Sequence, residues 1–303
     1  MKIDIEVTPS SKKITHQSKC IFIGSCFSDD ISGKFQEGGL DVLSNPFGTL
    51  FHPLAIANIF DEVDIESTCF LRGDVWFSWL ASGLIYAMSK EELVLKIEIL
   101  RQELIDSVQK ADFLFFTFGT SVGYRLISTN QLVANCHKMP LTNFSKELTD
   151  VNQLIFNWEK LIEKLKGLNP SIQIVFTVSP VRHIKDGIIE NNISKSHLFS
   201  LINQLEGEYF PSYEIVNDEL RDYRFFKEDL VHPNELAINY VWDKFKVAFM
   251  DISTNLLMDE VYQVRKMQNH NVLYPESIES LKFNDKLLRK KESIMNRLPN
   301  IKW

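Results

Sequence analysis

The chain has 303 residues, 45% of them hydrophobic and 24% charged, and its formal net charge is −7, from 33 basic and 40 acidic side chains. This composition is typical of a globular protein that folds as one large domain or as a main domain with an appendage. The acidic balance argues against a general affinity for nucleic acid or for an anionic membrane, so the expected partner is a small molecule.

Apolar runs and amphipathic patterns alternate along the chain. Four runs are typical of buried strands, and the shorter run Leu40–Leu43 is a fifth candidate. The four are Ile21–Gly24, Phe113–Phe118, Ile172–Val178 and Tyr213–Val216. Amphipathic helices are predicted over Glu91–Lys110, Leu154–Leu165, Ser194–Glu208 and Asn234–Phe249. Strands that are apolar on both faces and alternate with helices indicate a doubly wound α/β sandwich with a parallel sheet.

Two stretches interrupt this alternation. The segment 69–88 combines aromatic residues with turn signals, which predicts a small β insertion, and Val122–Ala134 is typical of a hairpin. The aromatic residues of the insertion, Trp76, Trp79 and Tyr86, could form a stacking platform for a ligand or belong to the core.

The main domain is expected to span residues 1–250, and residues 251–303 are expected to form a C-terminal helical extension. Its first helix is predicted to end near Met267. The apolar residues of that helix could cover the main domain or a partner subunit, so the oligomeric state stays open at this point. These residues are Leu256, Leu257, Val261 and Val264.

The cysteines and the N-terminal segment indicate a reducing compartment. The four cysteines form no C-x-x-C pair and have neither the density of a disulfide scaffold nor the spacing of a zinc knuckle. The first residues alternate charged and apolar side chains, and no window holds the roughly 18 uncharged apolar residues of a membrane-spanning helix. We therefore expect a cytoplasmic protein that needs no cofactor.

Cys26 stands where the first predicted strand runs into a helix-compatible stretch. Backbone N–H groups and the positive end of a helix dipole favour a thiolate at such a junction. The thiolate is the nucleophilic form of cysteine, so Cys26 is a candidate for covalent catalysis. The alternative is a small buried hydrophobe that fills the corner between strand and helix.

Ligands of open parallel sheets bind beyond the carboxyl ends of the strands, so the polar residues that follow each predicted strand should meet. These residues are Ser25, Cys26, Gly48, Ser121, Arg182, His183, Asp229 and His232. In a turn with the spacing of Asp229 and His232, the carboxylate can hold one imidazole nitrogen while the other faces the nucleophile. A surface loop with a solvated histidine is the alternative for this pair.

The segment Gly24–Ser28 (GSCFS) resembles the signature of the GSCFA family. Further segments match in order, so the resemblance covers roughly the first 250 residues. They are Asn45–Pro53, Asn135–Pro140, Ser179–His183 with Asn192–Leu198, and Tyr209–Pro233. GSCFA proteins resemble the SGNH (GDSL-type) hydrolases, which implies a three-layer α/β/α sandwich with a central parallel sheet.

The resemblance also implies roles for individual residues. Cys26 corresponds to the nucleophilic serine of the SGNH hydrolases, and Gly48 corresponds to a glycine that donates its amide to the oxyanion. Asp229 and His232 match the Asp-x-x-His pair without change. Ser121 replaces an asparagine that is a further oxyanion donor, a loss that commonly lowers the rate about 10²–10³-fold. Cysteine in place of serine suits acyl transfer or thioester chemistry.

Other polar residues of the same motifs have more than one candidate role. Asn135 could supply the oxyanion donor that Ser121 lacks. A metal bound by Cys136, His137 and His183 is not expected, because no ligand pair has helical or knuckle spacing. The two histidines could orient a substrate, with Arg182 suited to a carboxylate or phosphate, or they could be structural.

The sequence therefore predicts an SGNH-like hydrolase or acyltransferase that acts on ester or thioester bonds. Cys26 attacks the carbonyl carbon, His232 transfers the proton and Asp229 orients the imidazole. The amides of Cys26 and Gly48, together with Ser121, are expected to face the oxyanion. An acylated carbohydrate is the substrate class implied by the resemblance. A non-catalytic module that binds a glycan or another ligand is the alternative, and a redox-sensing thiol is a third.

Overall fold

The computed structural model describes residues 3–270, 273–299, 301 and 303. Five parallel strands form the central sheet, in the order β11-β10-β6-β1-β2. They are β1 (Lys19–Gly24), β2 (Asp41–Ser44), β6 (Phe113–Phe118), β10 (Gln173–Val178) and β11 (Glu208–Tyr209). Every residue of β6 is buried, as expected for a central strand that is covered on both faces.

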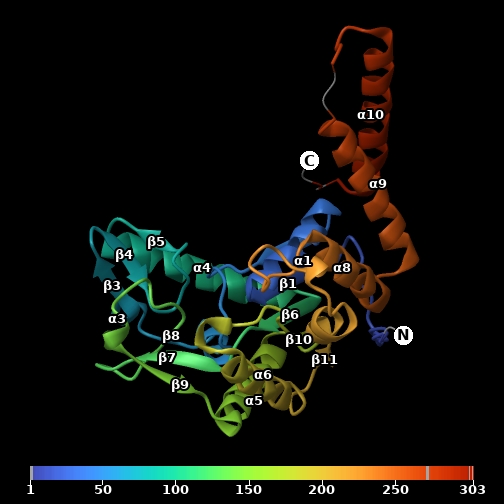
Figure 1. Ribbon diagram of the computed structural model, residues 1–303. Coiled ribbons are helices and arrows are strands. Elements are labelled where there is room, and N and C mark those ends of the chain that lie inside the picture. The colour runs from blue at the N-terminus through green and yellow to red at the C-terminus, as the bar shows by residue number, and fades with distance from the viewer. Residues whose placement is uncertain (1–2, 271–272, 300, 302) are drawn as a thin grey trace.

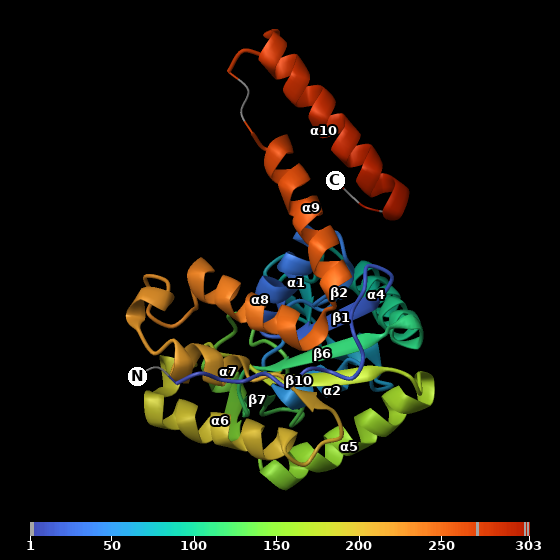
Figure 2. The same cartoon turned by 90° about the vertical axis from the view of Figure 1, so that its right-hand side faces the viewer.

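Helices cover both faces of this sheet. Alternate residues of β6 point into two separate apolar clusters, Leu114 and Phe116 into one, Phe115 into the other. The second cluster is closed by α1 (Cys26–Glu37) and α8 (Glu235–Phe249). The first is closed by α2 (Pro53–Asn58), α4 (Lys90–Lys110), α5 (Val151–Leu168) and α6 (Ile188–Ile202). Figure 2 shows α1 and α8 above the sheet and α5 and α6 below it. The predicted three-layer α/β/α sandwich is therefore confirmed.

The prediction of a strand at Tyr213–Val216 is wrong. These residues belong to α7 (Ser212–Glu214) and to the π-helical turn η3 (Ile215–Glu219). A segment as short as Tyr213–Val216 (YEIV) does not distinguish a strand from a buried helical segment, because both can bury its apolar side chains. The edge strand of the sheet is β11 instead, which pairs with β10. The Phe210 N–H, directly after β11, continues this pairing by donating to Phe176 O at 2.9 Å.

The helix predicted at Ser194–Glu208 is displaced along the chain. α6 begins at Ile188 and ends at Ile202, because Gly187 (φ 111°) supplies the turn at its start. Asn191 and Ser194, which are both buried, lie on the same face of α6 as Leu198. This face packs against the carboxyl edge of the sheet.

The two interruptions form small antiparallel sheets. The predicted insertion contains β3 (Cys69–Arg72), β4 (Val75–Ser78) and β5 (Tyr86–Ala87), preceded by the short helix α3 (Ile65–Thr68). The predicted hairpin contains β7 (Val122–Leu126) and β8 (Leu132–Val133). A third strand, β9 (Phe144–Leu148), pairs with β7 and follows the 3₁₀ turn η1 (Leu141–Asn143). Trp79 is buried and stacks on Phe70 with ring centroids 3.6 Å apart, so it belongs to the core.

The C-terminal extension is a pair of helices, α9 (Ile252–Gln268) and α10 (Ile278–Arg297), which projects from the sandwich (Figure 1). Val261 and Val264 of α9 pack against Ile294 of α10, so much of the apolar face of α9 is covered by α10 of the same chain. Residues 271–272, 300 and 302 of the predicted extension lie outside the described residues. Among the helices that the structure describes, none combines the length and the apolar character needed to cross a membrane.

Candidate active site

Cys26 is the first residue of α1 and lies directly beyond the carboxyl end of β1. At Gly24 (φ 150°) a Cβ atom would fall 2.8 Å from the Thr117 carbonyl carbon, so glycine allows β1 to approach β6 closely before the chain turns. Ser25 is fully buried and caps the helix, because its hydroxyl accepts from the Phe27 N–H at 3.3 Å. Ser25 thus orients the helix start that carries the thiol.

The Cys26 thiol is half-buried, and its pKa is raised. Burial is the main cause, the carboxylates of Asp30 and Asp29 add to it, and the backbone amides of Cys26 and Phe27 oppose it. Desolvation and two acidic neighbours thus outweigh the effect of the helix N-terminus, which by itself favours a thiolate. Attack by Cys26 would need a base.

Asp229 and His232 form a hydrogen-bonded pair in the loop before α8. This loop follows the 3₁₀ turn η4 (Tyr223–Phe225) and is closed by an isolated bridge between Phe226 and Pro233. The Asp229 carboxylate accepts from the Val231 and His232 backbone N–H groups, both at 2.9 Å, and from His232 Nδ1 at 2.6 Å. These bonds lower the pKa of Asp229 to about 2. An ionised carboxylate only accepts, so Nδ1 carries the hydrogen and Nε2 is the basic nitrogen.

Asp30 connects this loop with the start of α1. It lies four residues, about one helical turn, after Cys26. Burial raises the pKa of Asp30, and the positive charges of Lys227 and His232 oppose that rise. Lys227 and His232 of this loop thus lie within electrostatic range of Asp30, one turn along the helix that Cys26 begins.

Two residues expected at the oxyanion are already engaged elsewhere. The Gly48 N–H donates to Asn45 O at 2.7 Å, and a Cβ on Gly48 (φ 71°) would fall 2.7 Å from Ser82 Cβ. The Ser121 hydroxyl is buried and donates to Ser194 O at 2.9 Å. The expected donor roles of Gly48 and Ser121 are therefore corrected to structural ones, since both groups satisfy the protein itself.

Lys195 was not predicted as a site residue from the sequence, although it lies in one of the matching segments. Its side chain is buried (2% exposed) in α6, and Nζ donates to Gly119 O at 2.6 Å and to Ser179 O at 2.8 Å. Burial lowers the pKa of Lys195 to about 7, the charge of Cys26 raises it, and Arg182 lowers it further. The sequence did contain one signal for Lys195. It lies three residues before Leu198, so both fall on the buried face of α6.

Arg182 and His183 lie in the loop after β10, before the 3₁₀ turn η2 (Ile184–Asp186). The Nε atom of Arg182 is buried and has no hydrogen-bond partner among the described residues. The His183 ring packs edge-on against Phe51 at 5.4 Å, and its backbone N–H donates to Asn191 Oδ1 at 2.8 Å. The Nε of Arg182 is thus left without a partner among the described residues, while the His183 ring is held by packing.

Asn135 and His137 lie at the β insertion and have structural contacts. His137 Nε2 lies 3.0 Å from Ser78 O, and its ring lies against those of Phe70 and Trp79. Asn135 Oδ1 accepts from the His137 N–H at 2.7 Å. The structural alternative thus fits both better than oxyanion or substrate binding. No group of three or more metal-ligating side chains occurs within the described part of the chain.

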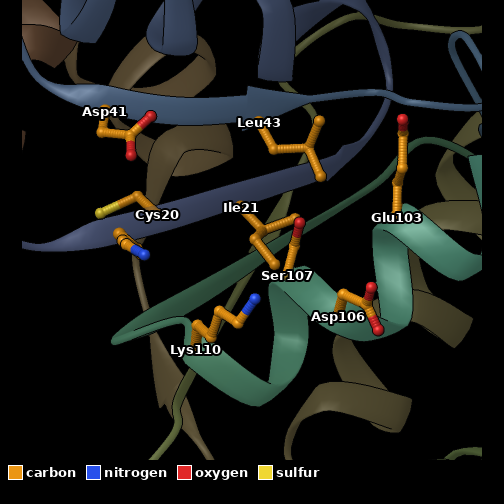
Figure 3. A pocket seen from close by; sticks show the side chains of 9 residues that line it. Cys20, Ile21, Asp41, Leu43, Glu103, Asp106, Ser107 and Lys110 are labelled. Atoms are coloured by element: carbon orange, nitrogen blue, oxygen red, sulfur yellow. The ribbon is translucent and has the colours of Figure 1, made fainter.

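A separate cavity of about 390 Å³ lies at the opposite edge of the sheet. Figure 3 shows Cys20 of β1 and Asp41 of β2 beside it, with Glu103, Asp106 and Lys110 supplied by α4. Burial raises the pKa of Cys20. Because this cavity adjoins the amino ends of β1 and β2, it lies apart from Cys26.

Three solved structures resemble the fold distantly. A carbohydrate esterase family 3 protein from Talaromyces cellulolyticus is 9% identical over 80% of this chain and 99% of its own, with a TM-score of 0.37. The periplasmic domain of a Salmonella ser. Paratyphi A lipopolysaccharide acetyltransferase is 12% identical over 77% and 83%, with a TM-score of 0.38. An acetyl esterase mutant, S10A, with acetate ion is 8% identical over 82% and 100%, with a TM-score of 0.34. At these values the similarities carry no argument about activity.

No curated protein matches the sequence. A family model described as the GSCFA family matches residues 19–245, from the first residue of β1 into α8. This range is most of the chain and contains Cys26, Lys195, Asp229 and His232. The chain belongs to the GSCFA family.

Proposed function

We propose that the chain is a hydrolase or acyltransferase that acts on ester or thioester bonds, with Cys26 as its nucleophile. The observation that carries this proposal is the 2.6 Å bond between Asp229 and His232 Nδ1, in a loop whose His232 lies within electrostatic range of Asp30, one turn after Cys26 in α1. A thiol of raised pKa needs a base, and an imidazole oriented by a carboxylate is suited to that task.

The reaction would proceed in two stages. His232 Nε2 accepts the thiol proton while Cys26 Sγ forms a bond to the acyl carbon, and Asp229 stabilises the imidazolium. The carbonyl oxygen becomes an oxyanion, for which the Cys26 backbone N–H is a donor. The intermediate then expels an alkoxide or thiolate, which takes the proton from His232. This stage leaves an acyl thioester on Cys26.

In the second stage a water molecule or an acceptor hydroxyl attacks the acyl thioester. His232 Nε2 takes its proton, a new oxygen–carbon bond forms, and the bond to Sγ breaks. The proton returns to the Cys26 sulfur, which regenerates the thiol. Water as the attacking group gives a hydrolase, and a hydroxyl gives an acyltransferase.

The substrate class follows from the family resemblance and from Arg182. An acylated carbohydrate is the class that the resemblance implies. The buried, unpaired Nε of Arg182 supports a carboxylate or phosphate on that substrate, because a guanidinium binds such groups in a two-donor geometry. A cytoplasmic location stays a prediction from composition.

The test is turnover of a panel of acyl esters and acyl thioesters, including p-nitrophenyl acetate, by the wild-type protein and by Cys26→Ala and Cys26→Ser. Wild-type turnover that is abolished in Cys26→Ala supports the proposal. Turnover that survives in Cys26→Ala contradicts it, since no other residue is proposed to attack the acyl carbon.

A non-catalytic ligand-binding module is the second candidate. The observation that favours it is the engagement of Gly48 and Ser121, which leaves fewer donors for an oxyanion than the resemblance implied. Absence of turnover across the panel, combined with calorimetric binding of a glycan that Arg182→Met weakens, would favour this candidate.

A further inference from the structure

The register of the sheet places three chain segments side by side at its carboxyl edge. β6 lies between β1 and β10, and Thr117 is opposite Gly24 on one side and Thr177 on the other. The pairing continues beyond β1, because the Ser25 N–H donates to Thr117 O at 3.1 Å. Cys26, Gly119 and Ser179 each lie two residues beyond that row. Neighbouring strands are about 4.8 Å apart, so Gly119 and Ser179 lie close together, and Cys26 begins α1 at the end of the strand on the other side of β6.

Lys195 enters this edge from α6. Its Nζ uses two donors on the Gly119 and Ser179 carbonyls, at 2.6 and 2.8 Å. The side chain is buried, and Nζ lies over the Tyr213 ring, 5.7 Å from its centroid. No carboxylate of the described chain lies within ion-pair distance of it. A buried ammonium is costly when it has no counter-ion.

We propose that Lys195 is a positioning residue whose buried ammonium is the counter-ion of the Cys26 thiolate. When His232 removes the thiol proton, a negative charge forms on Sγ at the carboxyl edge of the sheet, where the two carbonyls hold Nζ, and Lys195 keeps its own proton. The inference deepens the proposed function, because it says what stabilises the nucleophile on which that function rests. It requires only that the thiol ionises, not that the chain turns over an ester.

The surrounding charges agree with this role. The charge of Cys26 raises the pKa of Lys195, and because coupling between two charges is reciprocal, an ammonium here favours the thiolate, against the larger effects of burial, Asp30 and Asp29 on the pKa of Cys26. Arg182 is a second cation near Lys195 and lowers its pKa. The carboxylates of Asp29 and Asp30 in α1 raise the pKa of Cys26. Lys195 thus opposes the two carboxylates that hinder ionisation.

The first experiment measures alkylation of Cys26 by iodoacetamide as a function of pH, read on the Cys26 peptide by mass spectrometry. In Lys195→Met the midpoint should move upward by about one pH unit, so alkylation at neutral pH should slow about tenfold. Lys185→Met is the matched control, because this exposed lysine acts on Cys136 and should leave the Cys26 profile unchanged. An unchanged midpoint in folded Lys195→Met overturns the proposal.

A reciprocal measurement decides the matter if Lys195→Met does not fold. The Lys195 side chain is titrated by ¹³Cε NMR in the wild-type protein and in Cys26→Ala, and its resonance is assigned from Lys195→Arg. The midpoint should fall in Cys26→Ala, because ionisation of the thiol, which would favour the ammonium, no longer accompanies the Lys195 titration. Identical titrations contradict the pairing. If no ester is hydrolysed but both titrations move as expected, the proposed function fails while the pairing stands.

Discussion

Gly24→Ala tests whether the close approach of β1 and β6 sets the position of Cys26. The added Cβ would lie 2.8 Å from the Thr117 carbonyl carbon and 2.9 Å from its Cβ, whereas carbon atoms at rest lie about 3.5–4.0 Å apart. The strands must therefore separate by about 1 Å at the residue that precedes Ser25 and Cys26. The φ of 150° adds backbone strain, since residues with a side chain rarely adopt it.

The expected result of Gly24→Ala is a loss of about 1–3 kcal/mol in the free energy of unfolding, the usual cost of overpacking. Turnover should fall about 10²-fold, because a displacement of about 1 Å in a reacting group has that effect. Denaturant unfolding measures the first quantity and initial rates measure the second. Gly33→Ala is the matched control, because no atom lies within 4 Å of its added Cβ and alanine favours the helix. Equal stability and turnover in the two variants would refute the reasoning.

Three further predictions concern single side chains. Asp229→Asn should lower kcat/KM by about 10⁴-fold, because the asparagine amide, unlike the carboxylate, does not hold the His232 hydrogen on Nδ1, so Nε2 is no longer fixed as the base. Unchanged initial rates would contradict this. Ser121→Ala should cost about 1 kcal/mol in urea unfolding without changing kcat, because its hydroxyl bonds to Ser194 O; a kcat lowered about 10²-fold would restore its expected role as an oxyanion donor. Burial lowers the pKa of His52 to about 4. The unfolded chain therefore binds this proton first, and up to about 3 kcal/mol of stability should be lost as the pH falls from 6.5 to 4. His52→Gln should remove this part of the pH dependence, and an unchanged pH profile in that variant would argue against it.

The central strands could be predicted from the sequence because they are apolar on both faces. β6 was predicted with its observed bounds, and β1, β2 and β10 to within two residues at each end. The edge strand β11 was missed because it consists of two residues, Glu208 and Tyr209, which have no periodic pattern. The apolar run after it was assigned to the sheet in its place.

The candidate site was predictable only where it depends on chain order. Cys26, Asp229 and His232 follow from strand ends and a short spacing, and hydrogen bonding within one loop joins the last two. The thiol pKa was not predictable, because it depends on how deeply α1 is buried. Gly48 was assigned the wrong role and Lys195 was missed for a related reason. The role of each depends on the carbonyl to which it donates after folding, Asn45 O for the Gly48 amide and Gly119 O for the Lys195 ammonium.

The most direct test of the proposed chemistry is capture of the acyl group. The protein is mixed with an acyl thioester, quenched in acid at short times, and digested for peptide mass spectrometry. The wild-type protein should carry one acyl group on the Cys26 peptide, His232→Ala should acquire it far more slowly, and Cys26→Ala should never acquire it there. Sustained turnover without any acylated Cys26, or acylation at an equal rate in His232→Ala, would contradict the role given to the thiol and its base.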